Sequence, residues 1–421
     1  MFQDPELNAL EEKLVINNQN IRQYFENYMA ARALVRNARS SLFPSLATAP
    51  SVTRQGAGGS AAQSSGTISG TSFELPLTAS WEPDLFGSIR NTVLSDANAA
   101  QVSAANLANE TLSEQASLAQ YYFELRGEDA LQQVYDATVA SYKQTLDLTE
   151  ALVEVGIDSP QDVASAETNL RTAEANAVAV GTTRAQYEHA IALLIGEPAG
   201  GFSLPVRPLA ATPPVIPVGV PSQLLERRPD IAAAERTMAE ANALIGVQKA
   251  AYYPTIALSG SAGTQSSTIA DLASWPARFW SLGATVSQTL LDFGARRENV
   301  RRYQALYDAD VAAYRQTVLN AFKEVEDYLV AGRRLSEQVE RQKLAVDASE
   351  RYEEIAEVRY RTGMDTYLNV LTAQTSLLSN RLTLVNLQTG RMTSAVQLIA
   401  ALGGGWESGE MPSCAEVARK P

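Results

Sequence analysis

Cysteine and histidine are almost absent from this sequence. Its 421 residues include one cysteine, Cys414, and one histidine, His189. Disulfide frameworks, Cys/His zinc sites and the Ser-His or Cys-His pairs of nucleophilic enzymes all need more of these residues. The sequence therefore predicts no metal site, no cofactor and no enzymatic activity. We expect the histidine on a helical arm and the cysteine free in the C-terminal tail.

Positive charge and long apolar runs are scarce as well. The formal net charge is −13, and an acidic protein repels nucleic acid. No run of about 18 apolar residues is present that could form a membrane-spanning helix. The chain begins Met1-Phe2 without the charged and apolar segments of a signal peptide. This leaves two interpretations, a cytoplasmic protein or an exported one whose signal peptide has been removed.

What the sequence does contain is a very long helical pattern after Gly294. Apolar residues there follow steps of three and four, which is helical spacing, and the eleven-residue period keeps them nearly straight along the helix. These positions are Val300, Tyr303, Tyr307, Val311, Tyr314, Val318, Phe322, Val325 and Leu329. At about 1.5 Å per residue, the arm 294–361 would reach about 100 Å. Gly363 is expected to stop this helix, and Thr366 to cap the returning one.

The same pattern occurs twice. Three landmarks recur at a displacement of 207 positions: Phe86-Gly87 with Phe293-Gly294, Gly156 with Gly363, and Leu194-Ile195-Gly196 with Ala401-Leu402-Gly403. We therefore predict two structural repeats. The predicted boundaries are 1–196 for the first repeat, 197–221 for a proline-rich connector, 222–403 for the second repeat and 404–421 for a polar tail.

Each repeat is predicted to hold a short helix, two strands and a long helical hairpin. The short helices are expected at 4–39 and 222–251. Strands are expected at about 46–55, 72–82, 255–263 and 281–291, with a Gly/Ser-rich loop at 56–70 and an aromatic loop at 264–280. The hairpins are expected at 87–196, turning at 155–160, and at 294–402, turning at 361–366. Ser159 and Pro160 are typical of the first positions of a helix.

Four strands of about ten residues are long enough to cross a bilayer when they are tilted, but four strands cannot close. Open strand edges are not tolerated in lipid, so other subunits must complete the sheet. Two copies would supply eight strands and three would supply twelve. The pattern leaves one alternative open, an elongated coiled-coil protein of the periplasm with a structural or adaptor role and no pore.

Two segments resemble a known family. Residues 218–231 read VGVPSQLLERRPDI and are followed by ANALIG at 241–246, while residues 359–368 read RYRTGMDTYL. These segments resemble the central motif and second hairpin turn of the outer membrane factors, which are TolC-like efflux ducts, here of the NodT lineage. The turn Val155-Gly156-Ile157 is a weaker version of the second turn. The resemblance extends over essentially the whole chain.

The resemblance implies a mostly helical homotrimer in the cell outer membrane of a Gram-negative envelope. A twelve-stranded transmembrane β-barrel would continue into a periplasmic α-helical barrel, with the short helices, connector and tail forming an equatorial region. The resemblance further implies a passive exit duct for multidrug efflux. Its partners would be a periplasmic adaptor (membrane fusion) protein, an inner-membrane RND-type transporter and outer-membrane lipid. Many members of the lineage are lipoproteins, and this sequence leaves such an anchor open.

The resemblance also places a closable aperture at the turns. An aspartate matching Asp365 lines the constriction in close relatives, and carboxylate rings in a narrow pore favour cations. The expected gate and selectivity residues are Asp365, Asp162, Tyr360, Arg361 and Asn369. Helix capping is the alternative role, because Asp162 and Asn369 each stand three residues after an expected N-cap.

Two further sets of residues are expected to make contacts. The turns should meet the hairpin tips of the adaptor through Val155, Gly156, Ile157, Thr362, Gly363 and Met364. Aromatic residues near the strands suit a membrane-interface belt, with an ordinary core cluster as the alternative. These aromatic residues are Trp275, Phe279, Trp280 and Trp81.

Overall fold

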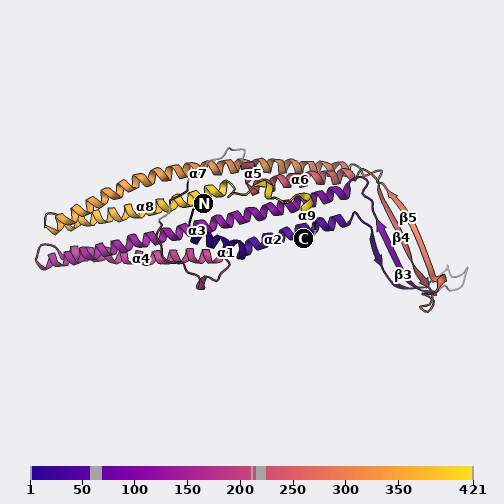
Figure 1. Ribbon diagram of the computed structural model, residues 1–421, viewed down its shortest axis with the longest axis horizontal. Coiled ribbons are helices and arrows are strands. Elements are labelled where there is room, and N and C mark those ends of the chain that lie inside the picture. Colours follow the sequence, from indigo (N-terminus) through magenta and orange to yellow (C-terminus); the bar gives the residue numbers. More distant parts are fainter. Residues whose placement is uncertain (1, 57–68, 210–211, 215–223, 420–421) are drawn as a thin grey trace. The chain divides into compact units, whose positions relative to one another are not determined.

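The computed structural model describes residues 2–56, 69–209, 212–214 and 224–419, which form long helices and one antiparallel sheet (Figure 1). The chain divides into two compact units, each assembled from separate stretches of sequence. The first unit comprises Met1–Glu26, Ala105–Ala232 and Gln316–Glu410. The second comprises Asn27–Ala104, Ala233–Arg315 and Met411–Pro421. Each unit therefore takes parts of both predicted repeats.

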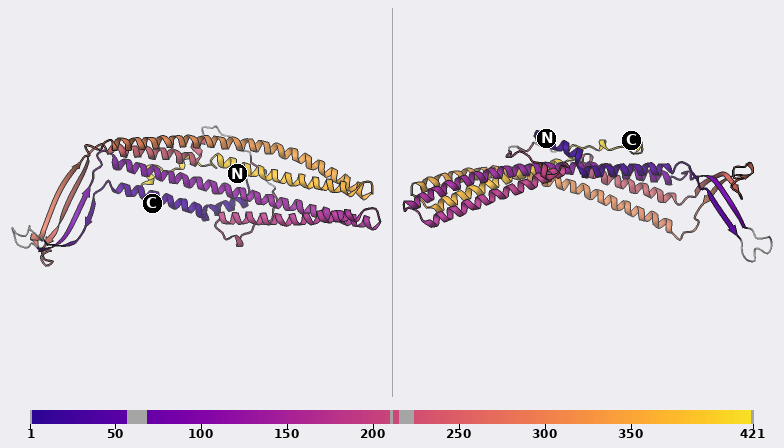
Figure 2. Two further views of the ribbon diagram at one scale, coloured as in Figure 1. Left: turned by 180° about the vertical axis from the view of Figure 1, so that it is seen from behind. Right: turned by 90° about the horizontal axis from the view of Figure 1, so that it is seen from below.

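Two helical hairpins dominate the structure. Helices α3 (Ser88–Glu154) and α7 (Ala295–Arg361) have 67 residues each, and α4 (Pro160–Leu194) and α8 (Tyr367–Ala401) have 35 each. Figure 2 shows α3 beside α4 and α7 beside α8 as antiparallel pairs. The turns between them fall within the predicted ranges. Gly156 and Gly363 have φ of 77° and 71°, the left-handed conformation that glycine adopts without strain.

The two return helices begin differently. Ser159 caps α4 as predicted, because its side chain accepts a hydrogen bond from the Asp162 amide. Thr366 occupies the N-cap position of α8 as predicted, but its side chain makes no capping bond. Instead the Asp365 carboxylate accepts the Thr366 amide at 3.0 Å. Asp365 also accepts the Asn369 side-chain amide, so this carboxylate fixes the start of α8 from one residue before the N-cap.

Both predicted short helices are broken in two. The first becomes α1 (Pro5–Asn17) and α2 (Gln19–Ser40), because Asn18 ends one helix with its amide on Leu14 O and starts the next by accepting the Ile21 amide at 3.0 Å. The second becomes α5 (Leu224–Arg227) and α6 (Pro229–Ala250). Here the ring of Pro229 disfavours helical geometry at the residue before it.

The sheet consists of β1 (Ser45–Thr48), β2 (Ser51–Gly56), β3 (Ser69–Trp81), β4 (Thr255–Ser266) and β5 (Arg278–Ser287). Its order is β1-β3-β4-β5, all antiparallel, with β2 also paired to β3. The predicted strand 46–55 is interrupted at Ala49 and Pro50, because neither Pro50 nor Pro76, which lies on β3 opposite this break, has an N–H to donate. Most of the predicted loop 56–70 lies outside the described residues.

The second predicted strand pair differs at its ends. Strand β4 continues to Ser266, while β5 begins at Arg278 and ends at Ser287, so that Thr264 pairs with Arg278. The short helix η4 (Trp275–Ala277), which contains Pro276, turns the chain directly into β5. The expected loop 264–280 is therefore too long, and Phe279 and Trp280 belong to the strand.

The connector and the tail are more structured than predicted. The connector contains η2 (Ala199–Gly201), while 210–211 and 215–223 lie outside the described residues. The tail forms η5 (Ser408–Glu410) and α9 (Cys414–Val417). Val417 is fully buried against Val35, Ala97 and Ala100 of the second unit, and Cys414 and Ala418 of the tail pack beside it.

No helix in the described part of the chain combines the length and apolar character needed to cross a membrane. His189 is exposed on α4, and Cys414 is a free, half-buried thiol.

The end of α8 contains a glycine that we expect to tolerate no side chain. Gly403 has a φ of 94°, and a Cβ there would lie 1.9 Å from Arg227 O. Gly403→Ala should therefore lower the melting temperature of the detergent-solubilised protein. Gly405→Ala is the matched control, because Gly405 has a φ of 103° with no atom within 4 Å of the added Cβ. The clash should add about 1–3 kcal/mol of destabilisation beyond the control, and equal melting temperatures would contradict it.

Candidate functional site

Tyr360 joins the two helical hairpins near their turns. Its hydroxyl donates to the Asp158 carboxylate of the first turn and lies 2.9 Å from Thr149 Oγ1 of α3. The ring is 2% exposed. Burial raises the pKa of the Tyr360 hydroxyl, and the bond to Asp158 raises it further. The hydroxyl therefore remains a hydrogen-bond donor at any physiological pH.

A polar seam extends this contact along α3, α7 and α8. Gln374 donates to Thr145 Oγ1 at 2.8 Å and to Ser141 Oγ at 3.2 Å, and Ser141 donates to Glu353 at 3.4 Å. Around the seam lie small and aromatic buried side chains, namely Ala166, Ala356, Tyr360, Tyr367, Val370 and Ala373. The hairpins therefore meet through individual hydrogen bonds in a thin apolar layer, an arrangement that a few substitutions can loosen.

Asp365 is held within its own hairpin. It accepts Arg359 Nε at 3.2 Å, the Thr366 amide at 3.0 Å and the Asn369 side-chain amide. The hydrogen bond from Asn369, followed by those from Thr366 and the charge of Arg359, holds the pKa of Asp365 below its usual range. This carboxylate is therefore ionised at neutral pH, with its charge partly balanced by Arg359.

The other two predicted gate residues have local partners. Asp162 accepts the Ser159 hydroxyl at 2.6 Å, so it serves the cap of α4. Arg361 donates to Glu357 at 2.5 Å, one turn back on α7. The structure thus brings Asp365 and Asn369 together, links Tyr360 to the opposite hairpin, and gives Asp162 and Arg361 contacts on their own helices.

Sequence reasoning missed Asp158, although a signal for it existed. Asp158 follows Gly156 by two residues, as Asp365 follows Gly363, and the two aspartates stand at the displacement of the predicted repeat. The structure uses them differently, since Asp158 binds across to Tyr360 while Asp365 binds its own helix start. Matching the two turns position by position would have selected Asp158 rather than Asp162.

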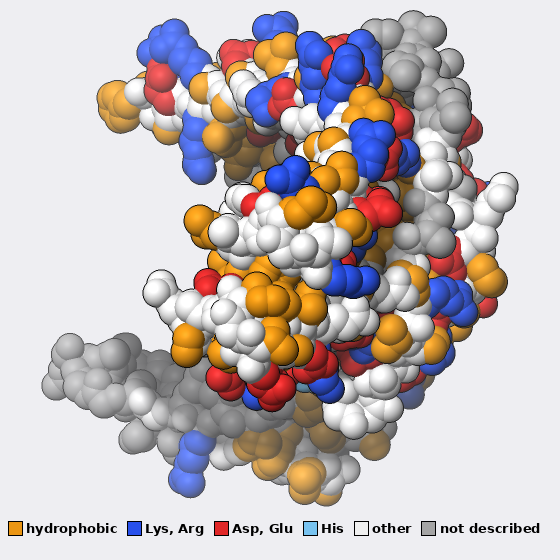
Figure 3. Space-filling view, turned by 90° about the vertical axis from the view of Figure 1, so that its left-hand side faces the viewer, with side chains coloured by type: hydrophobic (Ala, Val, Ile, Leu, Met, Phe, Trp, Pro, Cys, Tyr) orange, Lys and Arg blue, Asp and Glu red, His pale blue; other side chains and the backbone are white. Residues whose placement is uncertain are grey.

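The turns themselves present bare apolar side chains. Val155, Ile157 and Met364 are 68%, 64% and 66% exposed, and a Cβ on Gly156 or Gly363 would meet no atom within 4 Å. Figure 3 looks onto the end that carries both turns, where apolar side chains lie beside basic and acidic ones. Exposed apolar groups at a turn are available for contact with another protein.

One face of the sheet is apolar and exposed. Leu77, Ala262 and Trp280 are paired in register and so share this face, as do Trp81, Leu258 and Ala284. Trp280 is 76% exposed. Phe279 takes the opposite face, because neighbouring residues alternate along a strand. Trp275 lies just outside β5, with the Arg278 guanidinium 4.0 Å from its ring centre.

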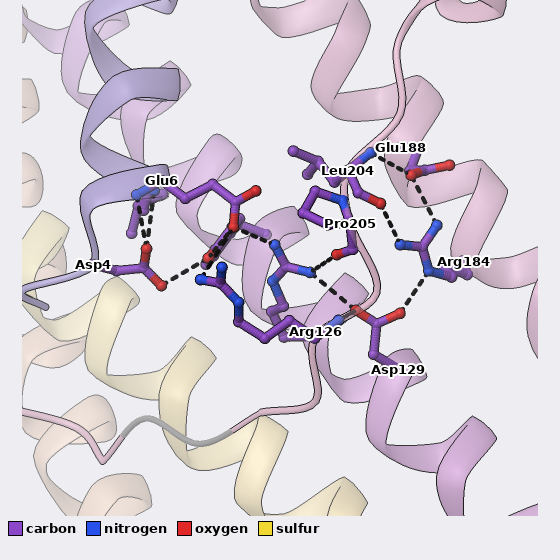
Figure 4. A network of polar contacts seen from close by, with 11 residues as sticks. Asp4, Glu6, Arg126, Asp129, Arg184, Glu188, Leu204 and Pro205 are labelled. Carbon is purple, nitrogen blue, oxygen red and sulfur yellow. Dashed lines mark hydrogen bonds and ion pairs between the residues drawn. The ribbon is translucent and has the colours of Figure 1, made fainter.

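A buried ion network, which the sequence did not suggest, centres on Asp129 of α3 (Figure 4). Asp129 is fully buried and accepts Arg184 Nε at 2.6 Å, Arg126 Nη1 at 3.0 Å and the Arg207 amide at 2.9 Å. Its partners come from α3, α4 and the connector. Full pairing of this kind is what allows a charge to be buried.

The same guanidiniums hold the connector against the helices. Arg126 donates to Pro205 O at 2.7 Å and Arg184 to Leu204 O at 2.8 Å. Arg126 also bonds to Glu6 of α1 at 2.6 Å. Helices α1, α3 and α4 and the connector that follows α4 are therefore joined in the first unit. Among the residues that the structure describes, no group of three or more His, Cys, Asp or Glu side chains could hold a metal ion.

Comparison with known proteins places this geometry in a family. The profile of the outer membrane efflux protein family matches residues 10–197 and 220–404. The probable efflux pump outer membrane protein TtgC of Pseudomonas putida is 33% identical over 410 residues, which cover 96% of this chain and 84% of that protein. Outer membrane protein OprJ of Pseudomonas aeruginosa is 31% identical, with 96% and 85% covered.

Solved structures agree with the sequence comparison. The outer-membrane channel OprN has a TM-score of 0.90 at 30% identity, with 96% of this chain and 91% of that one covered. The open state of the Neisseria gonorrhoeae MtrE outer membrane channel has a TM-score of 0.85 at 27% identity, with 96% and 90% covered. The chain therefore belongs to the outer membrane efflux protein family and is an efflux channel protein of the outer membrane.

Proposed function

We propose that this protein is a passive exit duct that works as a homotrimer. The observation that carries the proposal is the sheet, which has an exposed apolar face and ends in edge strands on both sides. Unpaired edges are not stable in lipid, so the strands must pair with those of other subunits. Strands β1 and β2 pair with the same neighbour, β3, and so count as one strand of a barrel. Each chain then supplies four strands, and three chains give a closed twelve-stranded barrel. Transport through it would need no catalytic residue and no cofactor.

We also propose that the chain is an internal duplication, as the sequence pattern predicts. The equal lengths of α3 and α7, and of α4 and α8, support this proposal. So do the left-handed glycines at matching positions, Gly87 with Gly294 and Gly196 with Gly403. In a trimer, six similar hairpins would line one tube with few distinct contacts.

The proposed partners follow from the exposed surfaces. Val155, Ile157 and Met364 would meet a periplasmic adaptor, which connects the duct to an inner-membrane RND-type transporter. The apolar sheet face, with Trp81 and Trp280, would contact outer-membrane lipid, and Trp275 would lie at the membrane interface. Phe279 does not fit this belt, because it lies on the other face of β5.

The proposed gate uses two kinds of contact. The bond between Tyr360 and Asp158 would keep the two hairpins together in the closed state. Asp365, with Asn369 and Arg359 around it, would line the aperture and favour cations. Asp162 and Arg361 would support this region through the ends of their own helices.

Single-channel recording in planar bilayers tests the duct and the role of Asp365. Asp365→Asn should reduce the ratio of cation to anion permeability at least about twofold, because a carboxylate ring loses its charge while Arg359 remains. Asp347→Asn is the matched control, an exposed acid on α7 about four turns before the end of that helix, and it should leave selectivity unchanged. Measurement of reversal potentials in asymmetric salt gives both values.

Two results would contradict these proposals separately. Unchanged selectivity in Asp365→Asn, with normal current, would remove Asp365 from the aperture and leave the duct intact. A protein that stays in solution without detergent and carries no current would instead support the non-pore coiled-coil alternative, which the family membership does not favour.

A further inference from the structure

The first unit contains a pocket away from the turns, between α1, α3 and α8. Its volume is about 260 Å³. Its walls are mainly apolar and include Leu7 of α1, Leu112 of α3 and Ile399 of α8. A cavity of this size, with apolar walls and a few polar groups, suits a small organic molecule.

One carboxyl group in this pocket has an oxygen atom without a partner. Glu11 of α1 lines the pocket, and its Oε2 atom is buried without a hydrogen bond to any described residue. Burial raises the pKa of Glu11 to about 7. The other lining residues from α1, α3, α8 and the turn at Gly404 carry no charge, so nothing in the pocket balances an ionised Glu11.

Unpaired buried carboxylates are unfavourable, and most buried polar atoms have a partner. Glu11 differs in this respect from Glu114 on the neighbouring α3, which is buried but accepts Asn20 Nδ2 at 2.7 Å. Two neutral side chains that can orient a ligand also line the pocket, Asn8 and Gln115. The pocket therefore offers an unpaired acceptor among apolar walls, which suits a cationic donor with an apolar body.

We propose that this pocket binds a small organic ammonium ion, whose N–H groups donate to Glu11 and whose apolar part lies against Leu7, Leu112 and Ile399. A divalent metal ion does not fit the site, because one carboxylate among apolar walls supplies too few ligands, whether for Ca²⁺, which takes six to eight oxygen atoms, or for Zn²⁺, which takes four ligands. The site is separate from the proposed gate, so a ligand here would act without blocking the aperture.

Binding should depend on pH through Glu11. The carboxylate must be ionised to hold the cation, and no other charged group lines the pocket. Affinity should therefore be highest above pH 7 and fall by about tenfold for each pH unit below it.

Isothermal titration of the full-length protein in detergent tests the proposal, with benzylammonium as the probe and benzyl alcohol as its neutral counterpart. We expect one benzylammonium per chain at pH 8, at least about tenfold tighter than benzyl alcohol, and about tenfold weaker binding at pH 6. Glu11→Gln should lose this preference for the cation. Glu12→Gln, an exposed neighbour on α1, should retain it. Equal binding by Glu11→Gln and the unmodified protein, or no saturable binding to either, would overturn the proposal.

Thermal melting shows independently whether Glu11→Gln is folded and whether Glu11 is buried in solution. Burial raises the pKa of Glu11 from 4.5 to about 7, because the folded protein favours the neutral carboxyl. The contribution of Glu11 to the free energy of unfolding is therefore complete below pH 4.5 and is lost as the pH rises through 7. Glutamine is neutral throughout. The melting temperature of Glu11→Gln should exceed that of the unmodified protein at pH 8 and match it at pH 4.5. A lower melting temperature at pH 8 would contradict a half-buried Glu11 whose Oε2 atom has no partner.

Discussion

Tyr360→Phe is expected to open the duct. The substitution keeps the buried ring and removes the hydroxyl that donates to Asp158, so the hairpins lose their direct contact between α7 and the first turn. A hydrogen bond to a charged acceptor contributes about 1.5–3 kcal/mol. If the bond exists only in the closed state, its loss shifts the closed-to-open ratio by about ten- to a hundredfold. Single-channel records should show a matching rise in open probability.

Tyr367→Phe is the matched control for this experiment. Tyr367 is a second buried tyrosine in the same cluster, 4% exposed, and its hydroxyl is 3.5 Å from Asn169 Nδ2. A contact of that length is weak, and the other partner of the hydroxyl, Ser165, is uncharged, so its removal should change gating much less than loss of the bond to Asp158. If the two substitutions raise the open probability equally, loosened packing rather than the hydroxyl would be the cause.

A double substitution identifies Asp158 as the partner. Asp158→Asn should open the duct as well, since it weakens the acceptor of the same bond. Combining it with Tyr360→Phe should add little, because both changes remove one interaction. Fully additive effects would show that the residues act separately.

The long helices could be predicted because their information is local and repeated. The apolar stripe after Gly294 continues for many turns, and glycines at the turns stop each arm where a left-handed residue is needed. The breaks at Asn18 and Arg228 were harder to predict. Each depends on one side chain or ring that overrides a continuing helical pattern.

The candidate site was only partly predictable. Asp365 and Tyr360 stand next to a recognisable turn, whereas the partner of Tyr360 depends on which residue of the other hairpin comes near. Thr149 and Asp158 are separated from Tyr360 by 211 and 202 positions. The pocket at Glu11 likewise needs three helices to meet. Periodicity within one helix carries no information on such contacts.

The largest loss of stability is expected for Asp129→Ala. Asp129 is fully buried and balances the guanidiniums of Arg126 and Arg184, which are 3% and 16% exposed. Removing one member of a buried ionic network leaves the others without full compensation, at a cost of about 3–5 kcal/mol. The melting temperature in detergent should fall accordingly. Asp136→Ala is the matched control, an exposed aspartate two turns later on α3 that accepts only Gln132 at 2.8 Å among the described contacts.

The same substitution should also free the connector. Asp129 accepts the Arg207 amide, and its two arginine partners hold the carbonyls of Leu204 and Pro205. Without Asp129 these arginines are no longer fixed, so limited proteolysis of the folded protein should cut near residues 204–207 well below the melting temperature. Asp136→Ala should resist cleavage there. If Asp129→Ala melted earlier but its connector stayed uncut, the network would stabilise the packing of α3 and α4 alone, and the connector would be held by its apolar contacts, among them the buried Leu204 in the core of the first unit.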